Sequence, residues 1–163
     1  QNQRDNSTVT NFLFFLPRQS WRTQFGYKIN TAITIRNRIE MLWYKQNAQN
    51  PDKGFLSFVD ILYKPMLSSI SGVVRLQYFE TDNYDSRIYA YENDVLYSYS
   101  IPAFYDKGFR YYLNINYDIN KKLSIWFRWA QTVYGNKQTV GSGLDEISGN
   151  KKSDIKLQIR WIF

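Results

Sequence analysis

The sequence predicts an all-β protein, an antiparallel transmembrane β-barrel of about ten strands or the C-terminal strands of a larger barrel. First, apolar and polar residues alternate along much of the 163-residue chain, as the side chains of a strand do. Second, no run approaches the roughly 20 apolar residues of a membrane-spanning helix. Third, aromatic residues make up 18% of the chain, and Tyr and Trp favour the bilayer interface. We expect residues 1–163 to form a single domain.

The last strand shows the alternation most clearly, because residues 153–163 read S-D-I-K-L-Q-I-R-W-I-F. One face carries Ile155, Leu157, Ile159, Trp161 and Phe163, and the other carries Asp154, Lys156, Gln158 and Arg160. A strand with one apolar and one charged face resembles the closing strand of an outer-membrane barrel, in which alternate residues face lipid and lumen.

Five upstream segments repeat this pattern at about the length that a tilted spanning strand needs. In chain order they are residues 21–29, 31–46, 70–78, 109–119 and 122–132.

Connections of two kinds alternate along the chain, as they do between the two rims of such barrels. Short turns are expected at residues 30–31, 65–68, 92–94 and 120–121, and longer external loops at 18–20, 47–54, 81–85, 102–108 and 133–152. This scheme needs a first strand at 8–16 and splits 87–100 into two strands, of which the first is the short segment 86–92. The result is ten strands with both termini periplasmic. The chain begins at Gln1 with no signal peptide, so we expect a processed chain or a fragment.

Charged residues at alternate strand positions are expected to line the lumen. This set comprises Arg36, Arg38, Glu40, Arg75, Glu92, Arg110, Asp118, Arg128, Lys156 and Arg160. One interpretation is a network of ion pairs that fills a narrow barrel, because buried charges have to be paired. The other is an anion-selective pore or an anionic-ligand site.

Aromatic residues on the opposite faces are expected to contact lipid and to form interfacial girdles. They are Phe25, Tyr27, Trp43, Tyr78, Tyr111, Tyr117, Phe127, Trp129, Trp161 and Phe163. An apolar external loop is the candidate contact for a protein partner. It contains Ile101, Pro102, Phe104 and Tyr105.

Catalytic and metal chemistry find little support. The chain has no His and no Cys, so Ser–His and Cys–His sites are impossible. Asp145 and Glu146, and the T-D-N-Y-D-S stretch at 81–86, offer only oxygen ligands in loops that turn chemistry explains. We expect no enzyme activity, no metal and no cofactor. The net charge of +7 is spread along the chain, so dedicated nucleic-acid binding is not expected.

Three stretches carry a family resemblance: D-S-R-I-Y-A-Y-E-N-D-V-L-Y-S-Y-S-I-P-A-F-Y at 85–105, R-Y-Y-L-N at 110–114 and G-S-G-L-D-E-I-S-G-N at 141–150. They resemble the C-terminal region of large outer-membrane proteins of Bacteroidetes, often labelled by a helix-hairpin-helix segment near the N-terminus. The resemblance covers roughly residues 21–163 and implies the membrane-embedded end of a larger protein. It implies no activity, and the helix-hairpin-helix segment is absent here.

The leading functional hypothesis is a non-enzymatic outer-membrane protein that docks to, or caps, a larger outer-membrane complex as a structural or accessory subunit. Its partners would be the lipid bilayer and other outer-membrane proteins. One alternative is a narrow pore or transporter for small anionic solutes. Another is a soluble β-sandwich or lipocalin-like binding domain.

Overall fold

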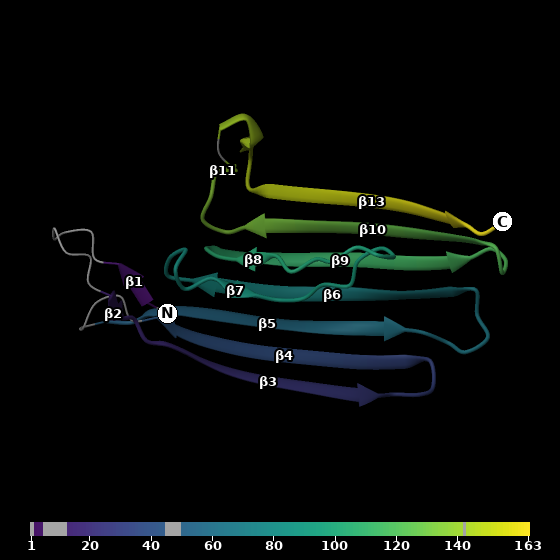
Figure 1. Cartoon of the computed structure of the whole chain (residues 1–163), viewed down its shortest axis with the longest axis horizontal. Helices are drawn as coiled ribbons and strands as arrows, with labels where there is room; N and C mark the ends of the chain where they lie inside the picture. Colours follow the sequence, from purple (N-terminus) through teal and green to yellow (C-terminus); the bar gives the residue numbers. More distant parts are fainter. Residues whose placement is uncertain (1, 5–12, 45–49, 142) are drawn as a thin grey trace.

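Seven long antiparallel strands form one sheet, and a long connection folds back over one of its faces (Figure 1). The computed structural model describes residues 2–4, 13–44, 50–141 and 143–163. The sheet strands are β3 (Arg18–Lys28), β4 (Ile33–Tyr44), β5 (Asp52–Tyr63), β6 (Ile70–Thr81), β9 (Lys107–Asp118), β10 (Leu123–Tyr134) and β13 (Lys151–Trp161). Their order in the sheet is β13-β10-β9-β6-β5-β4-β3. Each strand has 11 or 12 residues, which is enough to cross a bilayer when tilted.

Two of the turns at one end of the sheet are closed by asparagine side chains. Asn30 Oδ1 accepts hydrogen bonds from the N–H groups of Ala32 and Ile33, both at 2.8 Å. Asn120 Oδ1 accepts equivalent bonds from Lys122 at 2.8 Å and Leu123 at 2.9 Å. An asparagine that bonds to its own backbone favours a tight turn. Both turns therefore confirm the short connections expected at 30–31 and 120–121.

The remaining elements are short and lie outside the seven-stranded sheet. They are β1 (Asn2–Arg4), β2 (Leu13–Phe15), β7 (Ile88–Tyr89), β8 (Ala103–Phe104), β11 (Thr139–Val140), η1 (Gly143–Asp145) and β12 (Ile147–Ser148). Within the described ranges, no helix is long and apolar enough to cross a membrane.

The prediction of ten spanning strands is wrong for residues 82–106. Strand β6 pairs directly with β9, so residues 82–106 form one excursion between neighbouring strands. We call residues 82–106 the inner segment. Their own strand pairing, through β7 and β8 and a bridge between Glu92 and Ser100, lies within the segment, and Asp82 at its start donates a backbone hydrogen bond to Lys53 on β5. Figure 1 shows this segment lying against β6 and β9 instead of extending the sheet.

Two other expectations at the N-terminal side are also corrected or left open. Residues 18–20 belong to β3 and do not form a loop. Of the first expected strand, 8–16, residues 8–12 lie outside the described residues, and 13–15 pair with β1 in a separate two-stranded sheet. The periplasmic placement of both termini depended on that strand, and it stays a prediction. Among the described residues nothing pairs β3 with β13, so the sheet is not closed.

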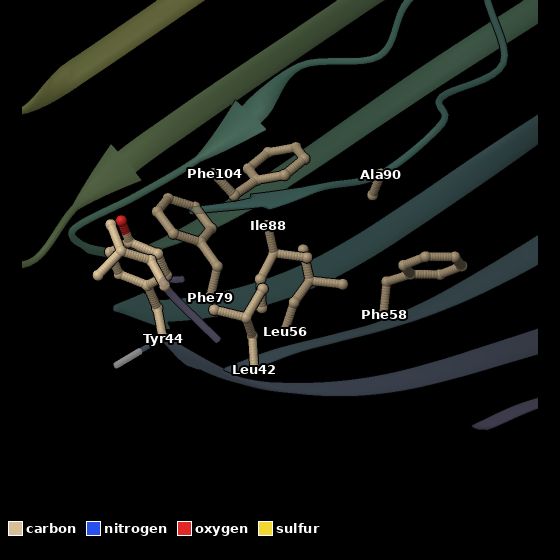
Figure 2. Packing of buried hydrophobic residues seen from close by; sticks show 9 residues of the cluster. Leu42, Tyr44, Leu56, Phe58, Phe79, Ile88, Ala90 and Phe104 are labelled. Atoms are coloured by element: carbon tan, nitrogen blue, oxygen red, sulfur yellow. The ribbon is translucent and has the colours of Figure 1, made fainter. Parts of the chain in front are cut away.

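The main hydrophobic core lies between the sheet and the inner segment (Figure 2). The sheet contributes Leu42, Tyr44, Leu56, Phe58 and Phe79, the inner segment contributes Ile88, Ala90 and Phe104, and Leu16 completes the cluster. The rings of Phe79 and Phe104 lie 5.3 Å apart. Burial of these side chains therefore fixes the inner segment to the sheet at the end where the long connections lie.

Gly54 lets the inner segment approach the sheet closely, and this predicts the effect of Gly54→Ala. A Cβ at residue 54 would overlap the backbone carbonyl of Ser86 and lie 3.3 Å from Ile88 Cδ1. We expect G54A to destabilise the fold by about 1–3 kcal/mol through overpacking. Gly26→Ala is the matched control, because its Cβ would meet only Arg36 Cγ, at 4.0 Å. Urea unfolding in detergent micelles would compare the two, and equal stabilities would contradict the close approach.

Candidate functional site

The two faces of the sheet differ in chemistry and in exposure. The face under the inner segment is buried: it holds the hydrophobic core towards the long-loop end and a set of charged residues, of which Arg75, Arg128 and Asp60 are at most 2% exposed. The opposite face is apolar and exposed along whole strands. Its exposed members include Trp21, Phe25, Tyr27, Val59, Ile61, Val74, Leu76, Phe109, Tyr117, Phe127, Ile155, Leu157, Ile159 and Trp161. A sheet in water usually hides its apolar face and exposes its polar face, so this arrangement is inverted.

The predicted girdle residues lie on the apolar face or next to it. Phe25, Tyr27, Tyr117, Phe127, Trp161 and Phe163 are exposed, whereas Trp43, Tyr78, Tyr111 and Trp129 are half-buried. The rings of Tyr78 and Phe109 lie 5.0 Å apart towards the long-loop end of the sheet. Trp161 and Phe163 stack with centroids 5.9 Å apart at the short-turn end. Aromatic side chains therefore gather towards both ends of the strands.

Glu92 of the inner segment lies at the centre of the buried charges. Its side chain is fully buried and accepts hydrogen bonds from Arg110 Nε at 2.6 Å and Arg110 Nη2 at 2.9 Å. Arg128 Nη2 donates to the same carboxylate. Asp154 on β13 accepts a further bond from Arg128 Nη1 at 2.6 Å. One carboxylate of the inner segment thus bridges two buried guanidinium groups on neighbouring strands.

Asp94 makes a second carboxylate contact between the inner segment and the sheet, next to Glu92. Lys156 Nζ donates to Asp94 Oδ2 at 2.6 Å, and the N–H of Val95 donates to Oδ1 at 2.8 Å. Burial acts to raise the pKa of Asp94, but these two hydrogen bonds and the charge of Arg128 together hold that pKa below its ordinary value. Asp94 therefore stays ionised at neutral pH and keeps its pairing with Lys156.

Arginines of the sheet also hold the backbone of the inner segment. The carbonyls of Arg87, Tyr89, Tyr91 and Asn93 accept hydrogen bonds from Arg18 at 2.8 Å, Arg38 at 3.1 Å, Arg75 at 2.7 Å and Arg128 at 3.2 Å. These carbonyls belong to alternate residues and point to one side of an extended chain. Guanidinium groups from four strands thus replace the neighbouring strand that would otherwise satisfy them.

Asp60 on β5 binds two further arginines of the sheet. Arg75 Nε and Nη2 donate to its two oxygens at 2.6 and 2.8 Å, and Arg36 Nη2 donates at 3.2 Å. The Arg75 guanidinium also lies over the ring of Phe58, at 3.7 Å from the centroid. Arg38 pairs with Glu40, which also accepts two bonds from Arg22 at 3.0 Å. Each of these buried charges therefore has a partner of opposite sign.

The structure brings most of the predicted lumenal residues together. Arg36, Arg38, Glu40, Arg75, Glu92, Arg110, Arg128 and Lys156 all take part in the ion pairs. Asp118 does not, since it is exposed at the short-turn end and accepts only from Asn116 at 3.3 Å. Arg160 donates to Ser124 Oγ at 3.1 Å and lies over the Trp126 ring, outside the ion pairs.

The predicted lumenal set left out three carboxylates of the network, Asp60, Asp94 and Asp154, although Asp154 was placed on the charged face of the last strand. Asp60 and Asp154 lie in phase with the charged face of their strands, so the alternation that selected the arginines could have selected them too. Asp94 was taken as part of a turn. No periodicity marks its role, because the inner segment lies outside the sheet.

The candidate partner loop needs a correction at Phe104. Phe104 is 4% exposed and belongs to the hydrophobic core, because β8 folds against the sheet and does not project from the rim. Ile101 is 54% exposed, and Pro102 and Tyr105 are half-buried. Of these four residues, Ile101 is the one whose side chain is exposed to a partner.

The described part of the chain offers little to bind a metal ion or an anionic ligand. No group of three or more His, Cys, Asp or Glu residues there could hold a metal ion. Asn83 Oδ1 accepts from the N–H groups of Asp85 and Ser86, which closes the turn proposed for an oxygen-ligand site. A cavity of about 360 Å³ lies between the inner segment and β13, but its Arg110 and Arg128 are already paired with carboxylates. Lys156, which also lines it, donates to Asp94, so three of its four lining cations, all but Lys152, already bind carboxylates.

No family model, curated protein or solved structure matches this chain. The resemblance to Bacteroidetes outer-membrane proteins therefore stays a prediction, and the functional conclusions below depend on the geometry of the chain itself.

Proposed function

We propose that the seven-stranded sheet is part of the wall of an outer-membrane β-barrel, and that the chain is a non-enzymatic structural or accessory subunit of a larger outer-membrane complex. The observation that carries this proposal is the inversion of the two faces. Strands of 11 or 12 residues expose apolar side chains on one side, as lipid-facing residues do. The other side holds paired charges under the inner segment.

The positions of the connections support an orientation in such a barrel. Connections 29–32, 64–69 and 119–122 are short and lie at one end of the sheet, while 82–106 and 135–150 lie at the other. Short turns are periplasmic and long loops external in these barrels. In this orientation, the C-terminal end of β13 is periplasmic.

The inner segment favours an occluded structural subunit over the alternative of a pore for small anions. An anion path needs cations that face water, but Arg75, Arg110 and Arg128 are buried and bonded to carboxylates of the chain. Glu92 and Asp94 occupy the positions that a permeating anion would need. We therefore expect the protein to be silent in planar bilayers.

Quenching of single tryptophans by brominated lipids tests the membrane placement. Trp161 is on the apolar face and 66% exposed, whereas Trp126 is on the polar face beside Arg160. Variants that keep only one of these residues, with the other Trp residues changed to Phe, form a matched pair. In vesicles of brominated lipid, we expect strong quenching of Trp161 and little quenching of Trp126. Unquenched Trp161, or a chain that stays dispersed without detergent, would contradict the proposal and favour a soluble binding domain.

A further inference from the structure

The two edge strands of the sheet lack a neighbour on one side. Among the described strands, β3 pairs only with β4, and β13 pairs only with β10. Both edge strands are 11 residues long and expose apolar side chains on one face. Free backbone N–H and C=O groups find no partner in hydrocarbon. If the sheet lies in a membrane, as proposed above, something has to pair with both edges.

Strand direction argues against closure of β3 on β13. Each of the seven strands is antiparallel to its neighbour, so the first and last strands of the sheet run in the same direction. Joining them would create a parallel pair, and so would joining either edge to a second copy with the same orientation in the membrane. Bacterial single-chain barrels have an even number of antiparallel strands. The seven strands therefore need an odd number of additional strands.

The size of the lumen sets a lower limit on that number. The interior of a barrel of about eight strands is filled by side chains alone. Here the inner segment places its own backbone against the polar face, with Glu92 and Ala90 fully buried. One additional strand would leave no room for it, so we expect at least three.

The charges on the polar face of each edge define the partner further. On β3 this face carries Arg18, Arg22 and Lys28, and no acidic residue; of the three, Arg22 already binds Glu40 on β4. On β13 it carries Lys152, Lys156 and Arg160, of which Lys156 already binds Asp94. Asp154, on the same face, already binds Arg110 and Arg128. The Nε group of Arg160 is buried and has no hydrogen-bond partner. Juxtaposed edges of this chain would bring cations together, whereas a strand with carboxylates would pair with them.

We infer that both edges dock antiparallel membrane-spanning strands from outside these 163 residues, three or a larger odd number in all, with carboxylates on their inward faces. This inference rests on the proposed function. The partner of the proposed barrel wall is a set of strands with alternating apolar and acidic residues, not a second copy of the chain.

Crosslinking from the edges in intact membranes tests the inference, and the absence of native Cys makes the variants clean. A photo-crosslinking amino acid is placed at Gln24 of β3 or at Gln158 of β13, and the captured peptides are sequenced. We expect each edge to capture a peptide from another sequence with Asp or Glu at alternate positions. In the Gln24→Cys/Gln158→Cys variant, a disulfide within one chain or between two copies would overturn the inference. Failure of both edges to capture such a peptide would also overturn it.

A charge variant adds a readout of the partner's chemistry. Arg160→Glu is expected to lower the crosslinking yield at Gln158 at least about tenfold, because it places like charges side by side. Arg160→Lys keeps the charge and should keep the yield, and Lys121→Glu in the adjacent turn controls for net charge. Equal crosslinking yields for Arg160→Glu and Arg160→Lys would show that the partner strand does not place a carboxylate beside residue 160. Trp161 quenching separates the membrane placement from the inference about partner strands. If Trp161 is quenched but the two edges are linked to each other, only the partner strands are refuted. If Trp161 is not quenched, the membrane placement is refuted as well.

Discussion

Replacement of Glu92 by Gln is expected to destabilise the fold by about 3–5 kcal/mol, because it removes the fully buried counter-charge of two buried guanidinium groups. Glu92 has no exposed side-chain surface, and its two partners, Arg110 and Arg128, keep only 9% and 1% of theirs. Gln fills nearly the same volume but removes the negative charge and one acceptor. Asp154 would remain as the acidic partner of both guanidinium groups, and it is itself 39% exposed.

The control for this prediction is Glu80→Gln at the rim of the sheet. Glu80 pairs with Lys107 at 3.1 Å, but their side chains are 48% and 52% exposed. An exposed pair of this kind contributes about 0–1 kcal/mol. Urea unfolding in detergent micelles, followed by tryptophan fluorescence, measures both variants. In parallel, limited proteolysis at Arg87 should accelerate in E92Q, since the inner segment loses its central anchor. Equal effects of E92Q and E80Q would show that Glu92 does not hold the segment.

The alternation predicted six of the seven long strands and the face to which their residues point, whereas β5 followed only from the connections expected on either side of it, at 47–54 and 65–68. Strand β13 illustrates why: Ile155 to Trp161 alternate strictly with charged or polar residues, and a shift of one residue would exchange the two faces completely. The same alternation placed Arg75 and Arg128 on the buried face. Single-strand periodicity is thus a strong signal wherever one face is apolar throughout.

The inner segment could not be predicted in the same way. Residues 87–100 look like one extended strand, and the expected order of short and long connections divided them into two spanning strands. Periodicity reports that a chain is extended, but not which groups satisfy its backbone. Here the carbonyls of Tyr89 and Tyr91 accept from arginine side chains instead of a neighbouring strand. The short length of the stretch was the available signal, and the preference for alternating short and long connections outweighed it.

The prediction that Phe104 is exposed was wrong for the same reason: the sequence pattern does not show that residues 82–106 fold over the sheet. An apolar loop between two strands at a rim would expose its aromatic residues, but a loop that folds over the sheet buries them. Apolar residues of 82–106 that an external loop would expose, such as Phe104, can therefore be buried against the sheet.

Replacement of Phe79 by Ala should cost about 3–5 kcal/mol, because it opens a cavity between the sheet and the inner segment. Phe79 is 1% exposed, and its ring lies 5.3 Å from that of Phe104 and 6.0 Å from that of Tyr134. Phe109 on β9 provides the comparison, since it is one residue from Gly108, the cross-strand partner of Phe79, and points to the other face. It is 60% exposed.

Phe109→Ala is expected to cost much less than Phe79→Ala in detergent micelles or lipid, because acyl chains can occupy the space that the ring leaves. The same urea titration measures both variants, and the difference between them reports which face of the sheet is packed against protein. A soluble sandwich predicts a different result. In that fold a second layer would cover the apolar face, and the loss of the Phe109 ring would create a cavity as costly as the loss of Phe79. Comparable losses of stability would therefore argue against lipid as the environment of the apolar face, whereas a large excess for Phe79→Ala is what a barrel wall requires.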